Sequence, residues 1–246
     1  RSDESVISLY MGYGYPGFYF DRTYLLVLIG VFLSLGASAM VRSAFSKYSG
    51  MPNGRRITGA QAAGEILRQA GIYDVRIEHI SGSLTDHYDP KNKVLRLSDT
   101  VYGSASVAAV SVAAHECGHA IQHQRGYVPL SLRTAIVPIA NFGSAISWPL
   151  ILVGIILGGA GNIFTTIGII LFTAVVAFHI ITLPVEFNAS GRALKILKES
   201  GMLYGDENAA AAKVLRAAAM TYVASAATMI LQLLRLLLIT RRNNDR

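Results

Sequence analysis

The chain has little cysteine, tryptophan and charge for its length. Its 246 residues include one cysteine and one tryptophan, and only 15% of them are charged. A single cysteine excludes an intramolecular disulfide and a cysteine-rich metal cluster. An ordinary soluble domain carries about 25% charged residues. The low charge, with 52% hydrophobic residues and a mean hydropathy of +0.42, therefore indicates a membrane protein.

Basic residues are in excess but are not clustered. The formal net charge is +7, and the 22 Lys and Arg residues are spread thinly along the chain. Nucleic-acid binding is not indicated, because a basic stripe interleaved with aromatic residues is missing. We expect the basic residues to orient the chain in a membrane instead.

Long apolar segments predict three or four membrane helices. Tyr24–Val41 has 18 residues without a charge, close to the roughly 20 that span a bilayer, and predicts a helix within residues 20–45. Residues 143–183 predict a helical hairpin that turns at the glycine-rich residues 158–162. Residues 220–240 contain Gln232 and Arg235, which are costly in lipid, so this segment is expected either to span or to lie partly embedded. Residues 1–19 form a tail to which no function is assigned.

Positive charges beside the apolar segments predict the orientation. Two basic residues precede the first predicted helix, whereas residues 42–144 contain 11 and residues 184–219 contain 5. Lys and Arg accumulate on the cytoplasmic side of a membrane protein. Both regions are therefore expected in the cytoplasm. The basic residues after the last apolar segment, Arg241, Arg242 and Arg246, argue against its crossing.

The region between the first helix and the hairpin, residues 46–142, reads as a small α+β domain. Thr58 is expected to cap a helix that ends near Ala70, and YDVRIEHIS alternates as a strand does. The stretch TDHYDPKNKVLRLS predicts a β-hairpin, and Ser104 is expected to open a helix through Gln124. The predicted fold is thus a mainly α-helical α+β membrane protein.

The stretch SVAAHECGHAIQH places an H-E-x-x-H motif on that last helix. The spacing of His115 and His119 puts both imidazoles on one helix face, where they can bind one Zn²⁺ ion. Glu116 can then reach a water on the metal. This motif predicts a hydrolytic zinc site with Glu116 as general base.

A catalytic zinc ion normally has three protein ligands. His123 lies eight residues after His115, and eight residues rise roughly 12 Å along a helix, which is too far for one ion. The third ligand is therefore expected to be a glutamate from another helix. Glu186 fits best, because it follows Pro184, which is expected to disrupt the end of the second helix of the hairpin. Its alternative interpretation is an acidic residue near a helix start. Weaker candidates are Glu65, Glu78, Glu199 and Glu207.

Four segments occur along the chain in a characteristic order. They are LTDHYDP, VLRLSDTVY, VAAHECGHAIQH and TLPVEFNAS. With them the chain closely resembles the YugP-type membrane neutral zinc metallopeptidases of bacteria, from about Tyr19 to Thr240. The resemblance implies a zincin-like metallopeptidase core in which His115 and His119 are zinc ligands, Glu116 is the catalytic base and Glu186 is the third ligand.

A more distant similarity, to the HtpX-type and CAAX-prenyl proteases, shows a departure. Those enzymes carry E-x-x-x-D around the third ligand, and here the fifth position is Ser190. Asn188 or another group would have to orient a metal ligand instead. The resemblance also implies an edge strand that pairs with substrate by β-augmentation, for which the candidate is the strand of Lys93, Val94, Leu95, Arg96 and Leu97.

A developing oxyanion needs a further hydrogen-bond donor, for which His87, His179 and Arg192 are candidates. Each also has an interpretation without a catalytic role. His87 would then be a polar residue at a strand edge, His179 a buried histidine with a hydrogen bond, and Arg192 a cation on a helix surface. Cys117 is interpreted as a packing residue.

The predicted function is a gluzincin-type zinc peptidase in the bacterial cytoplasmic membrane, with one Zn²⁺ and its active site facing the cytoplasm. Its expected partners are the lipid bilayer and a peptide or membrane-protein substrate. Two alternatives are a catalytically weak, metal-binding membrane scaffold and a zinc hydrolase of a non-peptide bond. The sequence leaves the oligomeric state open.

Overall fold

The computed structural model describes residues 23–158 and 162–244 of a mainly helical α+β protein, as predicted. The N-terminal tail 1–19 and the centre of the predicted glycine-rich turn lie outside these residues. The elements are α1 (Tyr24–Ser49), α2 (Gly59–Gln69), β1 (Arg76–Ile80), β2 (His87–Asp89), β3 (Val94–Ser98), α3 (Asp99–Tyr102), α4 (Val107–Gln124), α5 (Val128–Gly158), α6 (Ile163–Glu199) and α7 (Asp206–Asn244).

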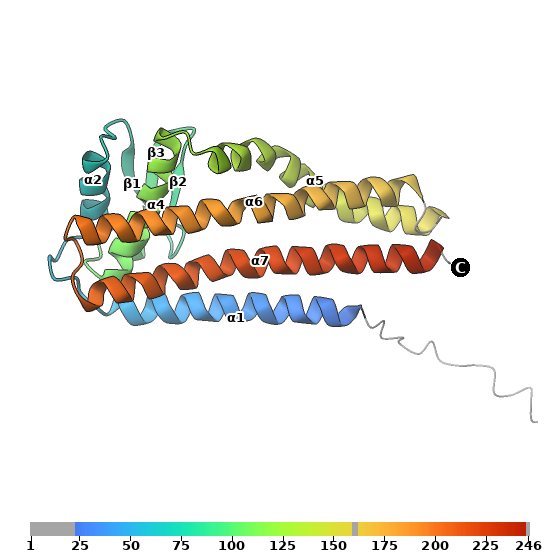
Figure 1. The fold of residues 1–246 in the computed structure, drawn as a ribbon, viewed down its shortest axis with the longest axis horizontal. Helices are drawn as coiled ribbons and strands as arrows, with labels where there is room; N and C mark the ends of the chain where they lie inside the picture. The colour runs from blue at the N-terminus through green and yellow to red at the C-terminus, as the bar shows by residue number, and fades with distance from the viewer. Residues whose placement is uncertain (1–22, 159–161, 245–246) are drawn as a thin grey trace, which may run out of the picture.

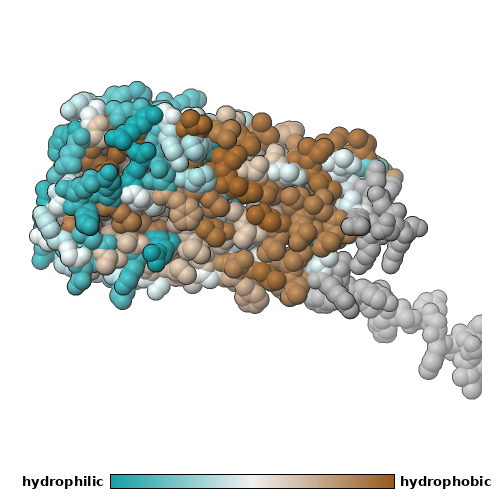
Figure 2. All heavy atoms as spheres, viewed as in Figure 1, coloured by the Kyte–Doolittle hydropathy of each residue, from teal (hydrophilic) through white to brown (hydrophobic). Residues whose placement is uncertain are grey.

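The molecule has an apolar end and a polar end (Figures 1 and 2). Helices α1, α5, α6 and α7 are each long and apolar enough to cross a membrane. Large apolar side chains on them face outward, such as Phe32 at 71% and Ile156 at 73% exposure. Such side chains are stable on an outer surface when lipid covers them. The polar end holds the sheet, α2 and α4 (Figure 1).

The last apolar segment belongs to α7, one continuous helix and one of the four candidate spans. Arg235 lies near the far end of this helix, with its guanidinium carbon 4.4 Å from the centre of the Tyr24 ring. Tyr24 is the first residue of α1, so this cation–π pair lies where α1 begins and not in mid-bundle. An amphipathic pair at the end of a span avoids the cost of a charge deep in lipid.

Two predicted boundaries are wrong in detail. Pro184 was expected to disrupt the end of the hairpin, but α6 continues through it to Glu199. Helix α5 likewise begins at Val128 and contains Pro138 and Pro149. A proline inside a helix removes one backbone hydrogen bond, and neighbouring helices in a membrane bundle compensate for that loss. Residue 186 is therefore carried by the middle of a long helix.

The small sheet has the order β1–β3–β2, with β1 parallel and β2 antiparallel to β3. The expectation that the strand Lys93–Leu97 is an open edge is wrong, because β3 has a neighbour on both sides. Its burial gives the physical reason: Val94, Leu95 and Leu97 are fully buried, as in a central strand packed on both faces. The short strand β2 forms the edge.

Two of the predicted helix caps can be compared with the structure. Thr58 and Gln61 form a reciprocal capping box at the start of α2, as predicted for Thr58. The motif helix α4 is instead capped by Ser106, whose Oγ accepts from the Ala109 N–H at 3.1 Å. Ser104 donates its hydroxyl to Ser106 Oγ. The predicted start of this helix was thus two residues early.

Candidate metal centre

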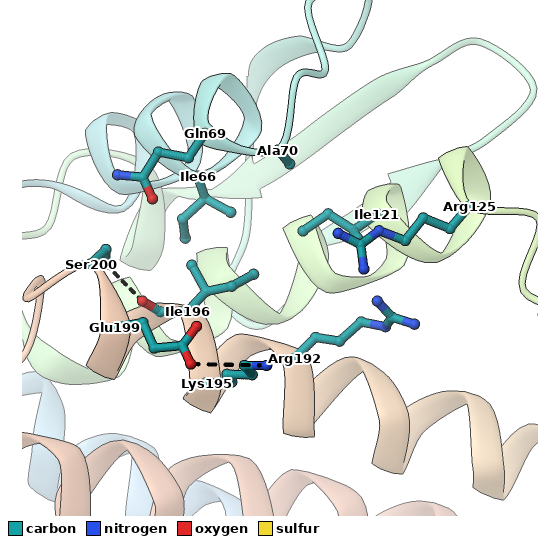
Figure 3. Close-up of a pocket in the computed structure, with 10 residues that line it drawn as sticks. All are labelled: Ile66, Gln69, Ala70, Ile121, Arg125, Arg192, Lys195, Ile196, Glu199 and Ser200. Atoms are coloured by element: carbon teal, nitrogen blue, oxygen red, sulfur yellow. Dashed lines mark hydrogen bonds and ion pairs between the residues drawn. The ribbon is translucent and has the colours of Figure 1, made fainter.

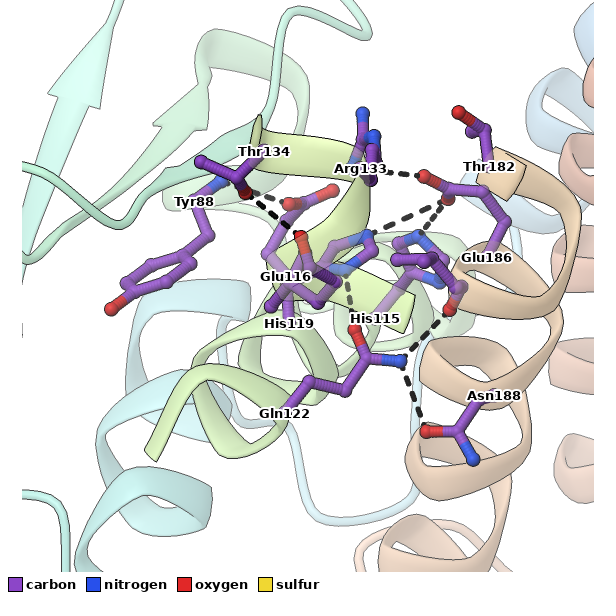
Figure 4. A network of polar contacts seen from close by, with 12 residues as sticks. Tyr88, His115, Glu116, His119, Gln122, Arg133, Thr134, Thr182, Glu186 and Asn188 are labelled. Carbon is purple, nitrogen blue, oxygen red and sulfur yellow. Dashed lines mark hydrogen bonds and ion pairs between the residues drawn. The ribbon is translucent and has the colours of Figure 1, made fainter. Parts of the chain in front are cut away.

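His115, His119 and Glu186 converge at the junction of α4 and α6. Each offers one ligand atom, and these atoms all lie within 4.8 Å of one another. Glu186 Oε2 is 3.2 Å from His115 Nε2 and 3.5 Å from His119 Nε2. Glu186 is only 2% exposed, and Figure 4 shows its carboxylate pointing at the two imidazoles.

This spacing fits a small cation. Ligands about 2.05 Å from a tetrahedral zinc ion lie about 3.3 Å from one another, close to the two distances of Glu186 Oε2. The electrostatics agree. Burial lowers the pKa of His119, but the hydrogen bond and charge of Glu186 and the charge of Glu116 outweigh it and raise that pKa. The centre therefore favours positive charge, and its two nitrogens and one oxygen are a donor set suited to zinc.

Neighbouring side chains fix which imidazole nitrogen faces the centre. The Gln122 amide nitrogen donates to the Val185 carbonyl at 2.9 Å and to Asn188 Oδ1 at 3.0 Å. Its oxygen must therefore point the other way, where it accepts from His119 Nδ1 at 3.0 Å. With the hydrogen on Nδ1, the Nε2 lone pair of His119 is free for a metal.

Ser190 does the same for the other histidine. Its Oγ lies 3.1 Å from His115 Nδ1, so a serine hydroxyl stands where more distant proteases have an acidic residue. Asn188 was expected to orient a metal ligand. Its link to a ligand is indirect, because it accepts a hydrogen bond from Gln122, which in turn contacts His119. Sequence reasoning missed Gln122, although its position one turn after His119 on the motif helix was an available signal.

Gly118, inside the motif, allows α6 to approach α4. A Cβ atom at this position would lie 2.7 Å from the Ala189 carbonyl oxygen and 3.2 Å from the Ala189 Cα. Only a glycine permits such a backbone approach. The same approach brings Glu186, one turn earlier on α6, within reach of His115.

Glu116 lies beside the centre rather than in the ligand group. Its Oε2 accepts a hydrogen bond from the Tyr88 backbone N–H on β2 at 3.0 Å. The Tyr88 hydroxyl lies 2.8 Å from His123 Nδ1. Burial, followed by the charges of Asp74 and Asp89, raises the pKa of Tyr88 to about 12, so this hydroxyl stays protonated and can donate. His123 is thus a support for β2.

Cys117 follows Glu116 but points away from the chemistry. It is fully buried, and burial, with a smaller contribution from the charge of Glu116, raises the pKa of its thiol. A neutral, inaccessible thiol is neither a nucleophile nor a ligand, in agreement with its interpretation as a packing residue.

The three candidate oxyanion donors lie in different places. His87 lines the cavity beside Glu116, and its Nδ1 donates to the Thr85 carbonyl. His179, half-buried on α6, packs edge-on against Phe178 and is not among the described residues lining this cavity. Arg192 donates to Asn188 at 2.7 Å and lines a separate cavity between α2, α4 and α6 (Figure 3).

The rival glutamates make other contacts. Glu65 pairs with Arg55 at 3.1 Å, Glu78 lies 3.5 Å from Arg96, and Glu199 lies 3.9 Å from Lys195. Glu207 accepts the backbone N–H groups of Gly54 and Tyr204. Among the described residues, the group that could hold a metal contains Glu186 alone of the glutamates.

Two residues at the centre were not anticipated from the sequence. Arg133, in the second turn of α5, has its Nη1 3.6 Å from Glu186 Oε1. Tyr222 on α7 lines the same cavity. Arg133 lies on the helix that follows the motif helix, and Tyr222 lies on the last helix. Neither belongs to the motif pattern, so no local signal pointed to them.

The comparisons with known proteins agree with this centre. Residues 23–241 match the family described as "Putative neutral zinc metallopeptidase". The chain is 46% identical over 220 residues, 89% of its length and 97% of the relative's, to a Bacillus subtilis (strain 168) protein named "Putative membrane protease YugP". No solved structure matches. A family match over most of the chain, with His115, His119 and Glu186 gathered at one point, leads to one conclusion: the chain belongs to this family of neutral zinc metallopeptidases.

Proposed function

We propose that this protein hydrolyses peptide bonds at a membrane surface, with one zinc ion held by His115, His119 and Glu186. The observation that supports this most directly is the meeting of these three side chains at a cavity of about 360 Å³, which Glu116, His119 and Glu186 line. A carboxylate next to a three-ligand zinc site is the arrangement used for metal-assisted hydrolysis.

When bound, zinc would act as a Lewis acid that lowers the pKa of a water molecule and polarises a carbonyl group. Glu116 is placed to act as the base. Glu116 Oε2 accepts a hydrogen bond from the Tyr88 N–H. This bond holds the carboxylate in position and leaves Oε1 able to take a proton. Glu116 removes a proton from the attacking water and later delivers it to the amide nitrogen as the carbon–nitrogen bond breaks.

Strand β2 is positioned to bind the substrate backbone. One side of β2 pairs with β3, and the Tyr88 N–H on the other side faces Glu116. His87 and Tyr88 both line the active-site cavity. Because the Tyr88 N–H is engaged by Glu116, the Tyr88 carbonyl is the backbone group of this edge to which an extended peptide can pair by β-augmentation. This transfers to β2 the role expected of the strand Lys93–Leu97.

The proposed location is the cytoplasmic face of the membrane. If all four candidate helices cross, the polar end carries the 11 basic residues of 42–144 and the 5 of 184–219, against 2 before α1 and 3 after residue 240. This distribution favours a cytoplasmic polar end. One of the three proposed ligands, Glu186, lies on α6, which is itself one of the candidate spans. This proximity to the membrane favours membrane proteins or membrane-associated peptides as substrates.

Glu116→Gln is the central test, because the amide oxygen can still accept from Tyr88 while the base is lost. The variant should keep about one zinc per chain, measured by elemental analysis, and should lose peptide hydrolysis by roughly 10²-fold or more. Comparison of membrane proteomes from cells that carry each form should show substrates accumulating with the variant. Equal turnover would remove Glu116 as base, and zinc binding without any peptide cleavage by the native protein would favour a scaffold or a non-peptide hydrolase.

Orientation is tested separately. Single cysteines at Asn92 and Lys198, in a Cys117→Ala background, should be protected from an impermeant maleimide in intact cells and labelled after lysis. Labelling of both from outside would reverse the orientation. Labelling of only one would place α4 and the end of α6 on opposite sides, which is incompatible with Glu186 as a ligand.

A further inference from the structure

Arg133 is a cation whose hydrogen-bonding capacity is largely unused. Its side chain is 30% exposed, and its Nη1 lies 3.6 Å from Glu186 Oε1, beyond normal hydrogen-bond range. Within the described part of the chain it makes no direct hydrogen bond. A guanidinium has five N–H donors, so this one has several free to bind a ligand.

These donors face the reaction space. Arg133 lines the cavity that also contains Glu116, His119 and Glu186. In Figure 4 it lies between Glu116 and Glu186, near the two histidines. Glu186 directs Oε2 at the histidines and Oε1 at Arg133, so the cation sits next to the metal position without occupying it.

The lining of the cavity strengthens the effect of this charge. Leu130, Val137 and Pro138 line the same cavity as Arg133. A fixed donor held beside apolar side chains stabilises a developing negative charge better than mobile water does. The earlier candidate His179 is not among the described residues that line this cavity, and Arg192 lines a different one.

We propose that Arg133 is a catalytic residue that binds the carbonyl oxygen of the scissile peptide and stabilises the oxyanion. This inference rests on the proposed peptidase function. As the water oxygen bonds to the carbonyl carbon, its proton passes to Glu116 and the electron pair of the carbonyl π bond moves onto the carbonyl oxygen. Arg133 donates to that oxygen while keeping its ion pair with Glu186. Collapse of this species breaks the carbon–nitrogen bond, and the proton leaves Glu116 for the amine.

The experiment uses zinc-loaded, detergent-purified full-length protein with Arg133→Gln, Arg133→Lys and the control Arg125→Gln. Arg125 is exposed and lines the other cavity. Zinc content and thermal unfolding are measured first. Hydrolysis of a peptide substrate then gives kcat and KM, and calorimetry gives the affinity for a phosphinic peptide, whose tetrahedral anionic group imitates the oxyanion.

Arg133→Gln should retain zinc and lower kcat by about 10²- to 10³-fold, the usual effect of losing one oxyanion donor, with a smaller change in KM. Binding of the phosphinic peptide should weaken by a similar factor, Arg133→Lys should recover part of both losses, and Arg125→Gln should match the native protein. In a further variant, Arg133→Ala, millimolar guanidinium should partly restore peptide hydrolysis.

Two results would overturn the proposal: a loss of zinc that accounts for the whole loss of activity, or unchanged phosphinic-peptide binding in Arg133→Gln. A native protein that binds the phosphinic peptide but cleaves no peptide would contradict the proposed function. In that case the dependence of binding on Arg133 still decides whether this residue binds the oxyanion.

Discussion

Gly118→Ala should disturb the metal centre without touching a ligand. The added Cβ would lie 2.7 Å from the Ala189 carbonyl oxygen, about 0.7 Å closer than the 3.4 Å at which ordinary contact begins. The obstacle is helix backbone, which cannot rotate away, so α6 must shift by most of that amount. Metal–ligand distances tolerate only about 0.2 Å of deviation.

The expected result is a zinc Kd raised by about 10- to 100-fold, the range seen when the support of a metal ligand is lost. Overpacking at such a contact also costs about 1–3 kcal/mol of stability. The matched control is Gly191→Ala, on α6, where a Cβ meets nothing within 4 Å. An alanine in an exposed helix position should be neutral or slightly stabilising.

Zinc affinity is measured by competition with a chromophoric chelator, and the stability of the metal-free protein by thermal unfolding in detergent. A Gly118→Ala protein that binds zinc as tightly as Gly191→Ala would refute the reasoning. It would mean that the close contact of α4 with Ala189 does not set the position of Glu186.

Three further predictions concern residues around the centre. Gln122→Leu leaves His119 Nδ1 without its acceptor and should raise the zinc Kd by about 10- to 100-fold, measured in the same competition assay. His123→Phe removes one hydrogen bond to Tyr88, worth about 0.5–1.5 kcal/mol, and should raise KM by about 2- to 10-fold at unchanged zinc content. Cys117 should resist maleimide at neutral pH in the folded protein and react in denaturant, because it is fully buried and its thiol pKa is raised. Rapid labelling of the folded protein would contradict that last prediction.

Much of the centre was predictable because its chemistry is local. Two histidines at helical spacing predict a metal-binding pair from the sequence alone, and the structure brings both into a group that could hold a metal ion. Thr58 likewise predicts the start of its helix, where the structure shows a local capping box. Glu186 could be predicted by elimination, because the sequence after the motif contains few glutamates in predicted helices. These features depend on residues within a few positions of one another, or on a scarce residue type.

The remaining features depend on contacts between distant segments. Arg133 reaches Glu186 across more than fifty residues, and nothing in the sequence around it distinguishes it from a basic residue at a helix start. The order of the sheet escaped prediction for a similar reason: β1 pairs with β3 rather than with its neighbour in sequence. Pro184 was misleading because isolated helices break at proline, whereas packed membrane helices accommodate it.

The hairpin of α5 and α6 brings Glu186 to the two histidines. The chain leaves α4 at Gln124, passes out along α5 and returns along α6 to Glu186. In the proposed topology, in which both candidate spans cross the membrane, this even number of crossings keeps Glu186 on the same side as α4. Arg133 lies on the outgoing helix and Glu186 on the returning one. Any sliding of α5 against α6 would therefore change the position of the guanidinium relative to the ligand carboxylate. The packing of the hairpin thus sets the position of Glu186, the proposed third ligand, and of Arg133, the residue proposed to stabilise the negative charge that develops on the carbonyl oxygen.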